Sequence, residues 1–342
     1  MTNEPEMLTG MVLNSVHGIY DVHTESGILR CTLRGKLKKA FIPSQAPRPA
    51  ATRSTSRYER LTAQAKAKRE EKAAQAAPAR LSVGDYVKLR QLDATTGVIE
   101  EILPRQSELS RRDSASSDKK VMQQTLLANL DQVVLVFSTA QPDPHFSMLD
   151  RYLAICESAG VHPVICLNKA DLMHEGYVDQ AAELYQHLDY PVIWSSTITE
   201  QGIGMLRSIL QNHMTLFTGP SGVGKSSLVN AIEPGMAIKT GLVSSATGKG
   251  KHTTTGSQLY PLSGGGWLAD SAGIRALATW NLSPAELPNC FVEFRPYLGA
   301  CEYSDCTHLD EEGCAVLQAV QNGSIDEHRH KSYTRILLEE ER

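Results

Sequence analysis

A glycine-rich segment with a single lysine spans residues 214–232 and has the sequence MTLFTGPSGVGKSSLVNAI. Its centre fits the pattern G-x-x-x-x-G-K-[ST], in which backbone N–H groups surround phosphate oxygens, the lysine reaches the β- and γ-phosphates, and the hydroxyl binds Mg²⁺. Glycine is needed because a Cβ atom would block the approach of the phosphates. The predicted phosphate-binding residues are Gly219, Pro220, Ser221, Gly222, Val223, Gly224, Lys225, Ser226 and Ser227.

A second motif, N-K-x-D, follows the apolar run PVICL and consists of Asn168, Lys169 and Asp171. The carboxylate of Asp171 can accept the two hydrogen bonds that N1–H and N2–H of guanine donate, and adenine does not offer this pair of donors. Ser195 and Ser196 follow the next apolar run, PVIW, and are candidates for further contacts with the base. The motif therefore predicts GTP as the nucleotide.

Two later segments could complete the site around the γ-phosphate. The polar stretch KTGLVSSATGKGKHTTTGSQ contains three consecutive threonines, one of which could coordinate Mg²⁺. Sequence does not decide which of the three does so, and Thr254 is the candidate named here. The run GGWLADSAGIR then supplies D-x-x-G, with Asp270 as a carboxylate near the metal and the N–H of Gly273 within reach of the γ-phosphate.

These residues predict hydrolysis of GTP by an attacking water. Lys225 and Mg²⁺ would neutralise phosphate charge, while Ser226 and a threonine would hold the metal. The residue after D-x-x-G is Ile274, which has no polar atom to orient the water, so intrinsic turnover is expected to be slow. His252 is the best substitute within the chain, although a solvated loop histidine without a role is an equal alternative.

A cluster of soft ligands lies near the C-terminus. Cys301, Cys306, His308 and Cys314 form the pattern C-x4-C-x-H-x5-C. Three thiolates and one imidazole make a closed tetrahedral set that suits structural Zn²⁺ and leaves no open position for catalysis. The alternative, core thiols beside a surface histidine, is disfavoured because the surrounding sequence is too polar to form a core.

The elements that must position these groups change character along the chain. From residue 121 onward apolar runs alternate with amphipathic stretches, which predicts a parallel α/β sheet. The carboxyl ends of such strands meet at one edge, where these sheets bind ligands. Residues 8–42 and 81–112 instead contain short alternating runs punctuated by Gly and Asp, which predicts a small β-barrel.

The positive charge of the chain is concentrated in its first third. Residues 1–120 carry 21 Lys and Arg against 14 Asp and Glu, whereas the remainder carries 13 against 24. Residues 43–80 hold nine basic against three acidic residues and are rich in Ala, Pro, Ser and Thr, so we expect a disordered or partner-ordered insertion. The asymmetry favours a polyanionic partner, and the basic run Arg34, Lys36, Lys38 and Lys39 fits a phosphate backbone or, equally, a solvated loop.

No apolar run approaches the roughly 20 residues of a membrane helix, and the N-terminus lacks the pattern of a signal peptide. We therefore expect a cytoplasmic protein that does not bind membranes. Four of the seven cysteines are dispersed, which argues for metal binding by the clustered three rather than for disulfides.

Taken together, the motifs resemble those of the GTPase superfamily, but their order differs. N-K-x-D and the S-S-T of Ser195, Ser196 and Thr197 precede the phosphate loop, and D-x-x-G follows it, which indicates a circular permutation. The D-x-x-G segment would then lead into the C-terminal domain, so nucleotide state could reorient that domain.

Among permuted GTPases, a barrel in front and a Cys/His cluster behind resemble the ribosome small subunit-dependent GTPase family. The resemblance covers nearly the whole chain. It is carried by LRGKL, VGDYV, NLDQVVLVFS, LNKADL, TGPSGVGKSSLVN, GKGKHTTT, DSAGIR and FRPYLGACEYSDCTHLDEEGCAV. It implies an OB-fold RNA-binding barrel in residues 1–112, a circularly permuted α/β GTPase domain in 113–283, and a mostly helical zinc-binding domain in 284–342. The insertion at 43–80 departs from the compact loop expected of the family.

The resemblance also implies a role. A member would be a monomer that binds the small ribosomal subunit and its rRNA late in subunit maturation, with GTP as substrate and Mg²⁺ and one Zn²⁺ bound. Hydrolysis would be stimulated by the subunit and coupled to release. Two other classes stay open at this point: a plain P-loop ATPase or kinase, which N-K-x-D argues against, and an RNA-binding module in which the nucleotide is only structural.

Overall fold

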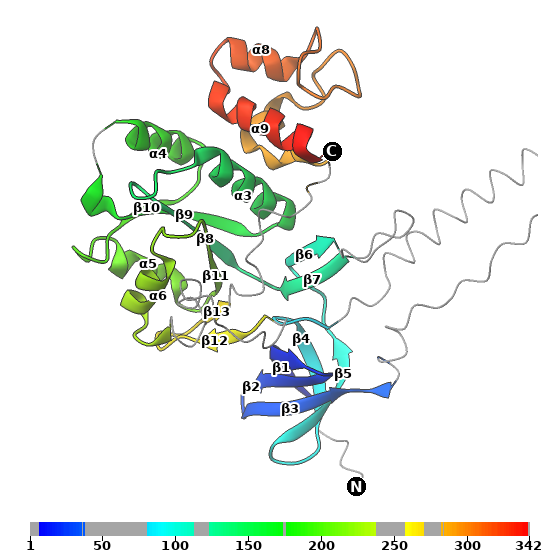
Figure 1. The fold of residues 1–342 in the computed structure, drawn as a ribbon. Helices are drawn as coiled ribbons and strands as arrows, with labels where there is room; N and C mark the ends of the chain where they lie inside the picture. Colours follow the sequence, from blue (N-terminus) through cyan, green and yellow to red (C-terminus); the bar gives the residue numbers. More distant parts are fainter. Residues whose placement is uncertain are drawn as a thin grey trace, which may run out of the picture.

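The computed structural model describes residues 7–35, 37, 81–112, 123–173, 176–236, 257–269, 282 and 284–340. Figure 1 shows a barrel, a central sheet covered by helices, and a C-terminal helical unit at the opposite end of the molecule from the barrel. No helix in these ranges combines the length and the apolar character that a membrane span requires.

The N-terminal unit is a closed barrel of five strands in the order β1-β2-β3-β5-β4. Its strands are β1 (Met7–Val16), β2 (Ile19–Thr24), β3 (Gly27–Leu33), β4 (Tyr86–Gln91) and β5 (Thr96–Ile102). The alternation in the sequence explains the closure: along β3, Leu29, Cys31 and Leu33 point into the core while Arg30 and Thr32 face outward. The predicted barrel is confirmed, and the insertion at 43–80 lies outside the described residues.

A two-stranded hairpin, β6 (Glu108–Arg112) with β7 (Gln123–Ala128), connects the barrel to the sheet. The boundary expected at residue 112 therefore lies between two paired strands. Gly84 of the barrel has a φ of +88°, and a Cβ atom there would lie 2.0 Å from the carbonyl oxygen of Ala128. The N–H of Ala128 also donates to the carbonyl of Val83 at 2.9 Å, so barrel and hairpin are in direct backbone contact.

The central sheet has six strands in the order β10-β9-β8-β11-β13-β12. They are β8 (Gln132–Ser138), β9 (His162–Asn168), β10 (Val192–Ser195), β11 (Met214–Thr218), β12 (Leu259–Pro261) and β13 (Trp267–Ala269). All pairs are parallel except β12 with β13. Every residue of β8 is buried, as expected of a central parallel strand covered on both faces.

Helices cover both faces of this sheet (Figure 1). One buried cluster contains side chains of α3 (Phe146–Ala159) and α4 (Tyr177–His187), and a separate cluster contains those of α5 (Ile203–Leu210) and α6 (Lys225–Ile232). Alternate residues of β8 belong to different clusters, with Val133 and Leu135 in the first and Val134 and Val136 in the second. The predicted α/β sheet is confirmed.

The C-terminal unit contains η4 (Leu287–Cys290), η5 (Val292–Tyr297), α8 (Ala315–Gln321) and α9 (Glu327–Glu340), and α9 packs on α3. Arg329 of α9 is only 1% exposed at this contact. Its guanidinium donates to Asp150 of α3 at 2.6 Å and to Glu293 of η5 at 2.6 Å and 3.1 Å. It also lies 4.6 Å from the ring centre of Phe291. A buried cation therefore joins the two units.

Candidate active site and metal centre

The glycine-rich loop lies where strand β11 ends and helix α6 begins. Gly219, Gly222 and Gly224 all have positive φ, at +147°, +82° and +94°. A Cβ atom on Gly219 would lie 2.0 Å from the carbonyl oxygen of Val136, and one on Gly224 would lie 2.4 Å from Nδ2 of Asn168. Other residues would be strained at these positions, so the glycines fix the path of the loop.

Lys225 begins helix α6 and folds back over the loop. Its Nζ donates to the carbonyl oxygens of Gly219 at 2.8 Å and Pro220 at 2.6 Å. Burial lowers the pKa of Lys225 from its ordinary value. Because an ammonium group has three donors, one remains for a phosphate oxygen, and the N-terminus of α6 adds favourable partial charge at the same place.

The other predicted loop residues divide by exposure. Val223 is buried, and Ser226 is half-buried in the first turn of α6. The exposed members are Ser221, Gly222 and Ser227. Of the two serines in G-K-S-S, the half-buried Ser226 is therefore the one held close to the loop.

Asn168 connects the guanine motif to the phosphate loop. It ends β9, is 2% exposed, and donates from Nδ2 to the carbonyl of Val223 at 2.8 Å. Ser195, at the end of β10, donates from Oγ to Oδ1 of Asn168 at 3.1 Å. Both side chains, which the sequence suggested as base contacts, are thus occupied in holding the strand ends and the loop together.

Asp171 is exposed and lies in the short helix η1 (Ala170–Leu172). The hydroxyl of Ser196 donates to Oδ1 of this carboxylate, and Oγ of Ser196 in turn accepts from the backbone N–H of Ile198 at 3.1 Å and Thr199 at 3.2 Å. An ionised carboxylate has about four acceptor positions, so one hydroxyl leaves enough for the two donors of guanine.

Lys169 is held by the loop after β8. It has a φ of +62°, and its carbonyl accepts from Oγ1 of Thr139 at 2.7 Å. Its ammonium donates to the carbonyl of Gln141. Neither Thr139 nor Gln141 belongs to a motif recognisable in the sequence, because both act through contacts with the segment that follows the neighbouring strand β9.

His252, Thr254, Asp270 and Gly273 lie outside the described residues. Ala269, the residue before Asp270, ends β13 and pairs in parallel with Leu216 of β11. The two strands therefore have their carboxyl ends at the same edge of the sheet, where β11 leads into the phosphate loop.

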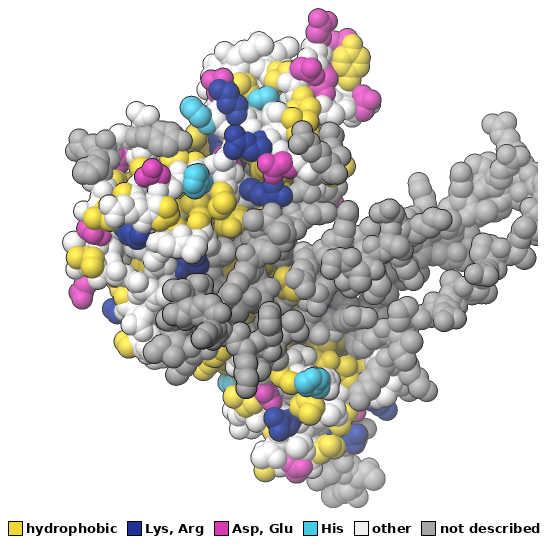
Figure 2. Space-filling view, in the orientation of Figure 1, with side chains coloured by type: hydrophobic (Ala, Val, Ile, Leu, Met, Phe, Trp, Pro, Cys, Tyr) yellow, Lys and Arg dark blue, Asp and Glu magenta, His cyan; other side chains and the backbone are white. Residues whose placement is uncertain are grey.

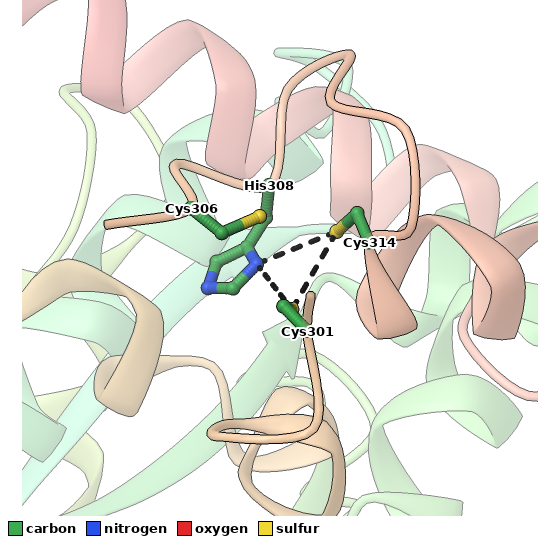
Figure 3. A group of neighbouring side chains, drawn as sticks. All are labelled: Cys301, Cys306, His308 and Cys314. Atoms are coloured by element: carbon green, nitrogen blue, oxygen red, sulfur yellow. Dashed lines mark hydrogen bonds between the residues drawn. The ribbon is translucent and has the colours of Figure 1, made fainter. Parts of the chain in front are cut away.

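The predicted zinc ligands meet in one place. The ligand atoms of Cys301, Cys306, His308 and Cys314 all lie within 4.8 Å of one another (Figure 3). Sγ of Cys301 is 3.9 Å from Sγ of Cys314, and Nδ1 of His308 is 3.6 Å and 3.5 Å from these two sulfurs. A tetrahedral zinc with Zn–S of about 2.3 Å and Zn–N of about 2.1 Å separates its ligands by about 3.6–3.8 Å. The residues therefore fit zinc.

The surrounding residues fix the two loops that carry these ligands. Glu311 accepts from the N–H of Thr307 at 2.6 Å and of Leu309 at 2.9 Å. Burial opposes its ionisation, but these hydrogen bonds and that of the Thr307 hydroxyl hold the pKa of Glu311 down at about 2. Tyr333 of α9 donates to the carbonyl of Thr307 at 2.7 Å, and Nε2 of His330 lies 2.8 Å from the carbonyl of His308.

Comparisons with known proteins identify relatives of this chain. The family model described as RsgA GTPase matches residues 102–280. The chain is 37% identical over 336 residues to the small ribosomal subunit biogenesis GTPase RsgA of Gemmatimonas aurantiaca. This alignment covers 96% of each protein. It is 44% identical over 260 residues to the small ribosomal subunit biogenesis GTPase RsgA of Pseudomonas aeruginosa. This alignment covers 75% of each protein.

Two solved structures are similar over nearly their whole length. The crystal structure of YjeQ from Thermotoga maritima has a TM-score of 0.70 at 29% identity and covers 98% of this chain and 99% of its own. The crystal structure of YloQ, described as a circularly permuted GTPase, has a TM-score of 0.68 at 26% identity. This match covers 100% of the present chain and 97% of the YloQ chain.

Proposed function

We propose a role in maturation of the small ribosomal subunit for this chain, which belongs to the RsgA GTPase family and is a GTP-hydrolysing enzyme. In this role it binds the small subunit and its rRNA in the GTP state, late in subunit maturation. The subunit stimulates hydrolysis, and hydrolysis leads to release. The observation that carries the proposal is similarity along 96% of the chain to a relative named for small-subunit biogenesis, so that barrel and zinc unit are included.

The phosphate loop and the guanine motif divide the work of binding. Asp171 selects guanine, while the loop amides and Lys225 hold the phosphates and neutralise the charge that develops on them. Ser226, Thr254 and Asp270 are the proposed residues around Mg²⁺, which supplies further positive charge beside the β- and γ-phosphates when bound. The N–H of Gly273 is proposed to contact the γ-phosphate.

None of the residues assigned so far orients the attacking water. Ile274 cannot orient water, so we propose that intrinsic turnover is slow and that His252 takes this role once the subunit is bound. Substitution of His252 by alanine should then reduce the subunit-stimulated rate. Unchanged stimulated turnover would exclude His252 from this role.

The outer face of the barrel supports contact with rRNA. Arg30, Lys88 and Arg90 lie there with 71%, 44% and 42% of their side-chain surface accessible, and they pair with the barrel carboxylates Asp21, Glu101 and Glu100, respectively. The knuckle of the zinc unit is instead acidic (Figure 2), with exposed Glu302, Asp305, Asp310 and Glu312. Carboxylates repel phosphates, and residues 298–314 contain no Lys or Arg to offset them, whereas the barrel carboxylates are paired with cations. We therefore assign the phosphate contacts to the barrel.

Loss of one such contact has a measurable signature. Lys88→Glu should weaken subunit binding and reduce the slope of log affinity against log salt concentration by about 1. An unchanged slope would place the phosphate contacts elsewhere.

The deciding experiment is GTP turnover by the full chain, without ribosomal particles, with small subunits and with large subunits, at one fixed salt concentration. Strong stimulation by small subunits alone is the expected result, and equal rates in all three would overturn the proposal. Binding should also be tighter with a non-hydrolysable GTP analogue than with GDP, as release after hydrolysis requires.

We further propose that the protein acts as a monomer in the cytoplasm. The two other classes left open by the sequence are disfavoured. An adenine nucleotide offers no pair of donors to the exposed Asp171, and a purely structural nucleotide disagrees with membership of a family of GTPases.

A further inference from the structure

The barrel contacts the central sheet at the edge formed by β12 and β13. Strand β1 has a bulge between Val12 and Asn14, which makes Leu13 the extra residue. Val12 lies in the barrel core, whereas Met11 and Leu13 belong to the large cluster that also contains Leu259 of β12. Strands β1 and β12 are in contact, as Figure 1 also shows. The outward side of β1 is therefore buried against the GTPase domain.

One pair of rings crosses this interface from the second barrel strand. His23 of β2 and Trp267 of β13 have their ring centres 5.0 Å apart with an angle of 71° between the planes, an edge-to-face arrangement. His23 is exposed and Trp267 is half-buried. Neither ring belongs to the residues that bind nucleotide or zinc, and the mechanism of hydrolysis does not use them.

Trp267 occupies a sensitive position in the sheet. It pairs with Met214, the first residue of the strand that leads into the phosphate loop, and its N–H donates to the carbonyl of His213 at 2.9 Å. A Cβ atom on the preceding Gly266 would lie 2.4 Å from the carbonyl of Leu210, so the chain is closely packed there. Three residues after Trp267 comes Asp270 of D-x-x-G.

We infer that the His23–Trp267 contact is a positioning contact that couples the barrel to hydrolysis. Binding of rRNA to the barrel shifts β2, and the paired rings carry this shift to β13 and so to its alignment with the P-loop strand β11. The inference rests on the proposed function, since it assigns the route of subunit stimulation. It requires the contact for stimulation and leaves subunit affinity largely independent of it.

Three variants of the full chain test this coupling. His23→Ala removes the ring, His23→Phe retains a ring that can pack edge-to-face, and His17→Asn is a matched control on the same barrel. His17 is exposed and has a φ of +51°, which asparagine tolerates. For each, basal turnover, turnover at saturating small subunits, and subunit affinity with a non-hydrolysable GTP analogue are measured.

The expected result is a split between binding and stimulation. The basal rate and the subunit affinity of His23→Ala should stay within about twofold of the wild-type values. Its subunit-stimulated rate should be at least about fivefold lower than that of the wild type, which is the lower end of a typical coupling between sites. His23→Phe should restore stimulation, and His17→Asn should match the wild type. A purely structural role of His23 would lower the basal rate as well.

The negative outcomes are distinct. If the wild type is stimulated and His23→Ala is stimulated equally, the inference alone is overturned. The same holds if His23→Ala regains the full rate once subunits saturate it, because His23 would then be a contact with the subunit. An unstimulated wild type would overturn the proposed function and this inference with it.

Discussion

Replacement of Arg329 by methionine tests what holds the C-terminal unit on helix α3. Arg329 is 1% exposed, and its guanidinium bonds to the carboxylates of Asp150 and Glu293, whose side chains are 4% and 5% exposed. Methionine fills much of the same space, so the main loss is the positive charge. The two carboxylates would then stay buried without a cation between them. The hydroxyl of Tyr185 would still donate a hydrogen bond to Asp150, at 2.7 Å.

The size of the effect follows from this arrangement. Removing one partner of a buried ion pair destabilises a protein by about 3–5 kcal/mol, because the other charge is left without compensation. The hydroxyl of Tyr185 still donates to Asp150, which favours the lower end of that range. About 3 kcal/mol corresponds to a fall in Tm of roughly 6–12 °C for an unfolding unit of 150–250 residues.

The assay is thermal unfolding followed by circular dichroism, together with limited proteolysis of α9. Arg335→Met is the matched control, because Arg335 lies on the same helix and donates to Oγ of Ser147 on α3 at 3.1 Å but is exposed. Its effect should stay within about 0.5 kcal/mol. Combining Arg329→Met with Asp150→Asn and Glu293→Gln should recover part of the loss. A Tm for Arg329→Met equal to that of the control would refute this reasoning.

Three further predictions concern the nucleotide and metal sites. Gly224→Ala should weaken GTP binding about tenfold or more, because the new Cβ would lie 2.4 Å from Nδ2 of Asn168 and the φ of +94° strains an alanine. Titration with a fluorescent GTP analogue measures this affinity, and a wild-type value would contradict the prediction. Asp171→Asn should reduce GTP affinity at least about a hundredfold, since two hydrogen bonds to a charged acceptor contribute about 1.5–3 kcal/mol each. Calorimetry with GTP and ATP would show the loss of the preference for GTP. A variant that still prefers GTP would place base recognition elsewhere. Cys306→Ala should lower the bound zinc below one ion per chain and reduce the Tm; a variant that keeps both would exclude Cys306 as a ligand.

Most of the fold was predictable because its signals are local. Alternating side chains along β3 predicted a barrel strand, and the continuous apolar run of β8 predicted a buried parallel strand. The soft ligands from Cys301 to Cys314 lie close together in sequence, so a short turn brings them within 4.8 Å. In each case the residues that specify the feature are near neighbours in the chain.

Contacts between distant residues were not predictable in the same way. The burial of Arg329 depends on Asp150, which is 179 positions away in sequence, so no local pattern indicates this pairing. A partial signal existed, since Arg329 lies four residues before the buried Tyr333 and thus on its face of α9. Asn168 was assigned to the base because of its motif, but its partner in the structure, the carbonyl of Val223, is 55 positions away.

The order of strands explains how two added units can act on one site. The P-loop strand β11 lies between β8 and β13. The barrel contacts β13 through Trp267, and the zinc unit contacts α3, the helix after β8, through Arg329. Each unit therefore touches an element on a different side of β11. Permutation makes this possible, because placing D-x-x-G last in the sheet frees the chain after β13 to form a domain that returns to α3.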